Sequence, residues 1–99
     1  MQLSPNTYSR MDLLFPVHQR REVEQLLIEE CGNNLPFLEN LDAFQLERFR
    51  FAVLKISDGN MDALYEAISL AQRDWRDVLV AAGFGHDPRA HEHWLPEQH

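Results

Sequence analysis

The fold is decided by residues 40–59, which read NLDAFQLERFRFAVLKISDG. Asn40 or Asp42 can cap the start of a helix, and Asp58-Gly59 is a typical end for one. At 100° per residue, one side of this helix carries Leu46, Phe49, Ala52, Val53 and Ile56, whereas Phe44, Phe51 and Leu54 fall roughly opposite. A helix that is apolar on both sides is normally packed between other elements. We therefore expect residues 42–57 to form a central helix.

The segments before this helix contain one further helix and an arm. Residues 19–31 place apolar side chains at helical spacing, and Gly32 stands where a left-handed C-terminal cap is wanted, before a turn at 33–36. Residues 1–18 contain Pro5 and Pro16 around one short apolar cluster. This composition is typical of an extended arm that docks on the rest of the protein.

Helices are also predicted after the central one. Asn60 can cap a helix whose apolar stripe ends at Ala71, and Asp74 can cap another that stops at Gly83 in a Schellman motif. Asp87 then begins a last short helix that reaches Trp94. The expected fold is all-α, a compact bundle of four helices plus a short C-terminal helix. The expected organisation is an arm at 1–18, one helical domain at 19–95 and a tail at 96–99.

Length and charge exclude several classes of function. A chain of 99 residues fits one domain, and nine Lys and Arg against sixteen Asp and Glu give a net charge of −7. This charge repels phosphate backbones, so we expect no nucleic-acid partner. We also expect no membrane association, because no apolar run approaches the ~20 residues of a membrane span. A single cysteine, Cys31, and the absence of a signal-peptide pattern predict a cytoplasmic protein.

Two motifs resemble a known group of proteins. Residues 47–55 read ERFRFAVLK, and residues 74–84 read DWRDVLVAAGF. From about Arg20 to Trp94 the chain is similar to a family of short bacterial helical proteins that pair a Glu-Arg-x-Arg-Phe-Ala-x-Leu-Lys helix with an Asp-Trp-Arg-Asp-x-Leu-x-x-Ala-Gly-Phe helix. No activity is attached to that family, so the resemblance implies a bacterial cytosolic protein and assigns no functional residue.

The spacing of the histidines and the position of the cysteine do not predict a metal or catalytic site. His91 and His93 are two positions apart, so on a helix they point away from each other, and His86 precedes the expected cap. A metal site at His86, His91 and His93 is kept as an alternative, while the main expectation is no metal and no cofactor. Cys31 at a helix end is expected to be a buried structural thiol. We therefore expect no enzymatic activity.

The remaining candidate is a surface that binds protein. Phe44, Phe51 and Leu54 need to be covered by a helix, by the arm or by another molecule, and the last option makes them partner-binding residues. The leading hypothesis is a non-enzymatic interaction or regulatory module, comparable in size and charge to small inhibitor or immunity proteins. Its acidic surface would bind a protein partner, of which a basic one is the natural complement. A homodimer is the other option for the apolar residues.

Overall fold

The computed structural model describes residues 3–32, 42–87 and 89–96, all of them in helices, turns and loops. Its elements are α1 (Pro5–Leu14), α2 (Val17–Glu30), α3 (Ala43–Ser57), α4 (Met61–Arg73), α5 (Trp75–Ala81) and a 3₁₀ helix, η1 (Ala90–His93). The part of the chain that is described contains no strand. The predicted all-α class is therefore confirmed, with one helix more than expected. The predicted turn at 33–36 and Asn40 lie outside the described residues.

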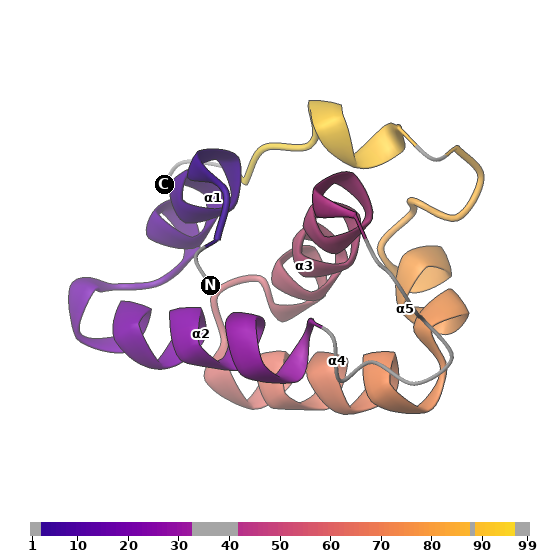
Figure 1. Cartoon of the computed structure of the whole chain (residues 1–99). Coiled ribbons are helices and arrows are strands. Elements are labelled where there is room, and N and C mark those ends of the chain that lie inside the picture. The colour runs from indigo at the N-terminus through magenta and orange to yellow at the C-terminus, as the bar shows by residue number, and fades with distance from the viewer. Residues whose placement is uncertain (1–2, 33–41, 88, 97–99) are drawn as a thin grey trace.

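The central position of α3 follows from its two apolar sides. Figure 1 shows α3 surrounded by α1, α4, α5 and the segment that contains η1, and each of these four elements packs against it. The four consecutive residues from Phe51 to Leu54 are all fully buried. Because a single helix face cannot bury four consecutive side chains, α3 has to be covered from several directions. The prediction of a central, sandwiched helix is confirmed.

The prediction of an extended arm at 1–18 is wrong, because residues 5–14 form α1. The Ser4 hydroxyl accepts a hydrogen bond from the Thr7 amide at 3.1 Å, and Pro5 occupies the first helical turn, where a missing N–H is harmless. Met11 and Phe15 are buried in the common core. The first helix is thus part of the single packed unit and not an appendage.

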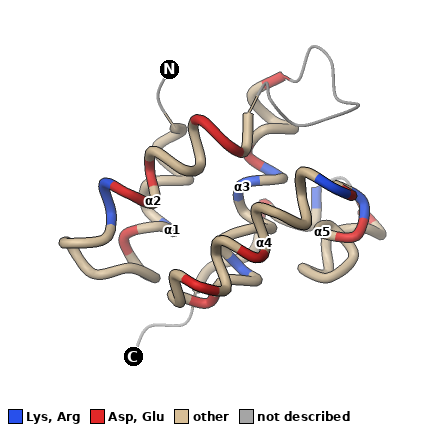
Figure 2. Tube along the Cα trace, turned by 90° about the horizontal axis from the view of Figure 1, so that it is seen from below, with Lys and Arg blue, Asp and Glu red and all other residues tan. Residues whose placement is uncertain are grey.

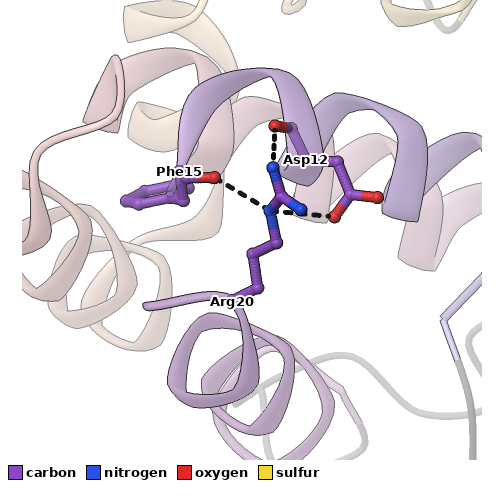
Figure 3. A network of polar contacts seen from close by, with 3 residues as sticks. All are labelled: Asp12, Phe15 and Arg20. Atoms are coloured by element: carbon purple, nitrogen blue, oxygen red, sulfur yellow. Dashed lines mark hydrogen bonds and ion pairs between the residues drawn. The ribbon is translucent and has the colours of Figure 1, made fainter. Parts of the chain in front are cut away.

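Arg20 fixes the corner between α1 and α2. Its guanidinium donates to the main-chain oxygen of Phe15 at 3.0 Å and to that of Asp12 at 2.9 Å, and it lies 3.5 Å from the Asp12 carboxylate (Figure 3). Carbonyls at a helix C-terminus have no partner within the helix. Arg20 supplies donors to two of them. The next helix, α2, begins at Val17, two residues before the predicted start.

The predicted left-handed cap at Gly32 is also wrong. Among the described glycines only Gly59 and Gly83 have positive φ. The helix α2 ends at Glu30, and its C-terminal cap is Cys31, with φ of −122°. Arg50 reaches this end from α3 and donates to the main-chain oxygens of Leu27 at 3.1 Å and Cys31 at 3.2 Å. A Cβ on Gly32 would lie 2.9 Å from the Ile28 oxygen. Close approach to the main chain of the last turn of α2, and not a left-handed backbone, therefore favours glycine at this position.

Three predicted N-terminal caps are confirmed. Asp42 accepts from the Gln45 amide at 2.8 Å, Asn60 accepts from the Ala63 amide at 2.9 Å, and Asp74 accepts from the amides of Arg76 and Asp77. The Schellman motif after α5 is confirmed as well. There the Phe84 amide donates to the Leu79 oxygen at 2.8 Å and the Gly83 amide donates to the Val80 oxygen at 3.0 Å.

The two ends of the described chain meet on one side of α3. Arg10 of α1 donates to the main-chain oxygen of Trp94 at 3.1 Å, and its guanidinium lies 4.5 Å from the centre of the Phe51 ring. The Trp94 ring packs edge to face on Phe51 and Phe84. The first helix and the last segment therefore close the same part of the core.

Two helices at the lower edge of Figure 1, α2 and α4, run in the same direction. The Tyr65 hydroxyl donates to a Glu22 carboxylate oxygen near their beginnings, and the Gln72 amide donates to the Glu30 carboxylate at 2.8 Å near their ends. These bonds place the two helices side by side. Within the described ranges, no helix has the length and apolar character needed to cross a membrane.

Candidate protein-binding surface

Two of the three predicted partner-binding residues are core residues. Phe51 and Leu54 have no exposed surface. The Phe51 ring contacts the guanidinium of Arg10 and the rings of His91 and Trp94, which come from the first helix and the last segment. The prediction that Phe51 and Leu54 bind another molecule is therefore wrong, because the chain itself covers this side of α3.

Phe44 is the one predicted partner-binding residue that reaches the surface. It keeps 39% of its surface exposed, while its ring packs edge to face on His91 with centroids 4.9 Å apart. An aromatic ring that is anchored on one side and exposed on the other can contribute to an interface. Phe44 alone, however, does not form an apolar patch.

The structure does not bring together the three histidines of the alternative metal site. The His91 side chain is buried against the rings of Phe44, Phe51 and Phe84, whereas His86 and His93 are exposed. No group of three or more His, Cys, Asp or Glu residues in the described segments is arranged to hold a metal ion. We therefore set aside the metal site at His86, His91 and His93. Sequence spacing did not indicate that His91 is a core residue.

The expectation of a buried structural thiol at Cys31 is confirmed. Its side chain is fully buried, and burial raises the pKa of this thiol to about 12, an effect that the nearby Arg50 guanidinium only partly offsets. A thiol with so high a pKa is protonated at neutral pH. Cys31 is thus a packing residue between α2 and α3.

Half of the arginines bind main-chain carbonyls inside the molecule, which the sequence did not reveal. Arg10 and Arg48 donate to the oxygens of Trp94 and Phe84, and Arg20 and Arg50 cap the ends of α1 and α2 as described above. The burial of Arg50 lowers its pKa, because desolvation disfavours the charged form. These four cations therefore contribute less to the surface than the composition implies.

Among the described residues, acidic side chains therefore outnumber basic ones more strongly at the exposed positions than overall. Of the fourteen Asp and Glu residues in the described segments none is buried and ten are exposed: Asp12, Glu22, Glu29, Asp42, Asp58, Asp62, Glu66, Asp74, Asp77 and Asp87. The exposed cations are Arg21, Lys55, Arg73, Arg76 and Arg89. Figure 2 shows acidic residues over α1, α2 and α4, with both signs alternating at the corner between α4 and α5.

One part of this surface combines carboxylates with an aromatic ring. We define the acidic α2–α4 surface as Glu22, Glu29, Asp62 and Tyr65, all of which are exposed. Tyr65 keeps 45% of its surface accessible and is tethered to Glu22 by its hydroxyl. Asp62 lies one turn before Tyr65 on α4, and Glu29 lies two turns after Glu22 on α2. The surface thus has a positioned aromatic ring with negative charge around it.

The two motifs that resemble short bacterial proteins lie on neighbouring elements. Residues 47–55 belong to α3, residues 74–84 cover the cap, helix and stop of α5, and α3 packs on α5. Their apolar residues therefore meet in the core, and the resemblance stays a prediction about origin. Searches with this chain against family models, curated proteins and solved structures find no match.

Proposed function

We propose that this chain is a non-enzymatic interaction module that binds a basic protein through the acidic α2–α4 surface. The observation that supports the proposal is the imbalance of exposed charge, with ten exposed carboxylates against five exposed cations in the described segments. Such a surface attracts positively charged proteins over long range and raises their association rate.

The composition of the acidic α2–α4 surface fits protein recognition. Aromatic residues, Tyr among them, are enriched among the residues that carry most of the energy of protein interfaces. Tyr65 is partly buried and held by Glu22, so little side-chain freedom is lost when a partner covers it. A small helical inhibitor of a basic bacterial protein, acting in the cytoplasm, is the setting we propose.

Two variants of equal net charge test the proposal. The first, Glu22→Gln/Glu29→Gln/Asp62→Asn, removes three charges from the acidic α2–α4 surface. The second, Asp42→Asn/Asp77→Asn/Asp87→Asn, removes three exposed charges elsewhere. Both change the net charge from −7 to −4. Each protein and the wild type are immobilised and exposed to a bacterial extract, and the proteins released by rising salt are identified.

We expect the wild type and the second variant to retain the same basic protein, and the first variant to lose it. Circular dichroism of all three proteins controls for folding. If both variants lose the partner equally, binding depends on overall charge and the acidic α2–α4 surface is not the site. If no basic protein is retained by the wild type, the proposed function is wrong.

A further inference from the structure

A groove runs along α4 beside Ile56 of α3. It is lined by Ile56 of α3 and by six residues of α4, and its volume is about 390 Å³; the α4 residues are Ala63, Glu66, Ala67, Ser69, Leu70 and Arg73. Ala67 is buried at the bottom, and Ile56 and Leu70 are half-buried. We call the seven lining residues the α4 groove. Figure 1 shows α4 along the lower edge of the molecule, with no described element beneath it.

The α4 groove carries one acidic and one basic residue on the same stripe. Glu66, Leu70 and Arg73 follow each other at spacings of four and three, so they share a face of α4. Glu66 and Arg73 are both exposed, and neither has a hydrogen-bond or ion-pair partner for its side chain in the described part of the chain. They are seven residues apart, about 10.5 Å along the axis, so they are too distant to pair with each other.

The opposite charges of Glu66 and Arg73 make this face of α4 complementary to the same face of a second copy. If two α4 helices pack antiparallel about a two-fold axis between residues 69 and 70, Glu66 of each copy faces Arg73 of the partner subunit. A two-fold interface needs this property, because the same patch is used on both subunits. Ala63 and Ser69 have small side chains on either side of the Glu66–Arg73 stripe and let the two helices approach closely. Leu70 of each copy then projects toward the groove of the other.

We propose that the α4 groove docks a second copy of this chain, with the two α4 helices antiparallel and with two Glu66–Arg73 pairs between subunits. The docking face is one helix of 13 residues, about 20 Å long. Interfaces at the small end of the range form weak complexes. The dimer is therefore favoured at high protein concentration. It does not depend on the proposed binding of a basic protein, which uses other residues.

Charge reversal distinguishes this dimer from other associations. Glu66→Arg places like charges at both pairs of the homodimer, and so does Arg73→Glu. An equimolar mixture of the two variants restores opposite charges at both pairs, but only in the mixed dimer. Sedimentation velocity of the wild type, each variant and the mixture, from about 10 μM to 1 mM, measures self-association. We expect each single variant to associate at least ~10-fold more weakly than the wild type and the mixture to recover it.

A matched pair of variants controls for net charge. Glu29→Arg and Arg21→Glu reverse exposed charges on α2 and change the net charge by the same amounts. Neither variant is expected to weaken the dimer by the ~10-fold of the Glu66 and Arg73 reversals, and mixing them is expected to have no effect. A wild type that is monomeric at all concentrations would overturn the proposal. A mixture of the Glu66 and Arg73 variants that remains monomeric while both are folded would overturn it as well.

Discussion

Phe44 and Phe51 lie two turns apart on α3 and have opposite environments. The Phe51 ring is fully buried and is surrounded by Arg10, His91 and Trp94, whereas the Phe44 ring is partly in solvent. Removing a buried ring leaves a cavity, and removing a surface ring leaves little. We expect Phe51→Ala to reduce the free energy of unfolding by about 3–5 kcal/mol and Phe44→Ala to reduce it by under about 1.5 kcal/mol.

Urea denaturation followed by circular dichroism measures both values. Trp94 packs on Phe51, so its fluorescence reports the same loss of packing locally. Equal effects of the two substitutions would contradict the burial described here. They would leave Phe51 as a candidate for binding another molecule.

Because of the Cys31 thiol, the free energy of unfolding should change with pH in the alkaline range. Its pKa is raised from an ordinary value of 9.0 to about 12 in the folded chain. The folded state therefore disfavours the thiolate, so this contribution is fully present below pH 9 and is lost as pH rises toward 12. At pH 10 the free energy of unfolding should be lower than at pH 8 by on the order of 1 kcal/mol.

The variant Cys31→Ala isolates this contribution. Between pH 8 and pH 10 the free energy of unfolding of this variant should fall less than that of the wild type, and the difference is the contribution of the thiol. Tyr8 and Tyr65 also have raised pKa values, Tyr8 mainly through burial and Tyr65 mainly through its bond to Glu22, but both are present in either protein. Identical pH profiles for the wild type and Cys31→Ala would show that the thiol is accessible to water.

At the scale of the elements, two glycines with the same backbone conformation have different surroundings. Gly59 and Gly83 have φ of 82° and 81°. A Cβ on Gly83 would meet only the Lys55 Nζ at 3.6 Å, whereas a Cβ on Gly59 would lie 2.6 Å from the Leu14 main-chain oxygen. The end of α1 thus packs against the turn between α3 and α4.

We expect Gly83→Ala to lower the free energy of unfolding by about 1–2 kcal/mol, because a residue with a Cβ is strained in a left-handed backbone conformation. Gly59→Ala should cost clearly more, because the main chain of α1 also has to move. Thermal denaturation of the two variants ranks them. If Gly59→Ala is the milder change, α1 does not pack on this turn in solution.

Helix boundaries that depend on neighbouring residues were predictable, and those that depend on distant residues were not. Asp42, Asn60 and Asp74 cap their own helices, so the sequence identified them. The start of α1 has a similar local signal in Ser4-Pro5, but Pro5 and Pro16 are equally typical of an extended arm. The end of α2 had no local signal, because its carbonyls are bonded by Arg50 of α3.

At the scale of the whole molecule, exposed acidic residues outnumber exposed basic ones by two to one in the described segments. Repulsion among them destabilises the folded state, and salt screens it. Ion pairs act in the opposite direction, but Arg20–Asp12 and Arg89–Glu92 are at the surface, where such pairs contribute about 0–1 kcal/mol. We expect repulsion to dominate, so the urea midpoint should rise as NaCl increases.

The variant Glu22→Gln/Glu29→Gln/Asp62→Asn provides the comparison for this effect. With three fewer charges it should gain less stability from the same addition of salt. A urea midpoint of the wild type that falls with NaCl would mean that attractive pairs outweigh the repulsion. The exposed carboxylates would then be balanced by positive side chains of the same protein, and they would attract a basic partner less strongly.

The candidate site could be predicted only where it depends on composition. Net charge was readable from the sequence, and the acidic α2–α4 surface is consistent with it. The covering of Phe51 and Leu54 could not be predicted, because it requires α1 and the segment around Trp94 to meet over α3. Helical periodicity identifies apolar faces but does not say which segment of the chain covers each one.

The hydrogen bond from Arg10 to Trp94 joins residues that are 84 positions apart in the sequence. A ribosome releases a chain from its N-terminus, so α1 emerges long before the segment that completes its contacts. Until Trp94 has left the exit tunnel, the Phe51 side of α3 is covered by α1 alone. The nascent chain therefore exposes apolar surface on this side of α3 until the segment around Trp94 has emerged, and this part of the core can close only then.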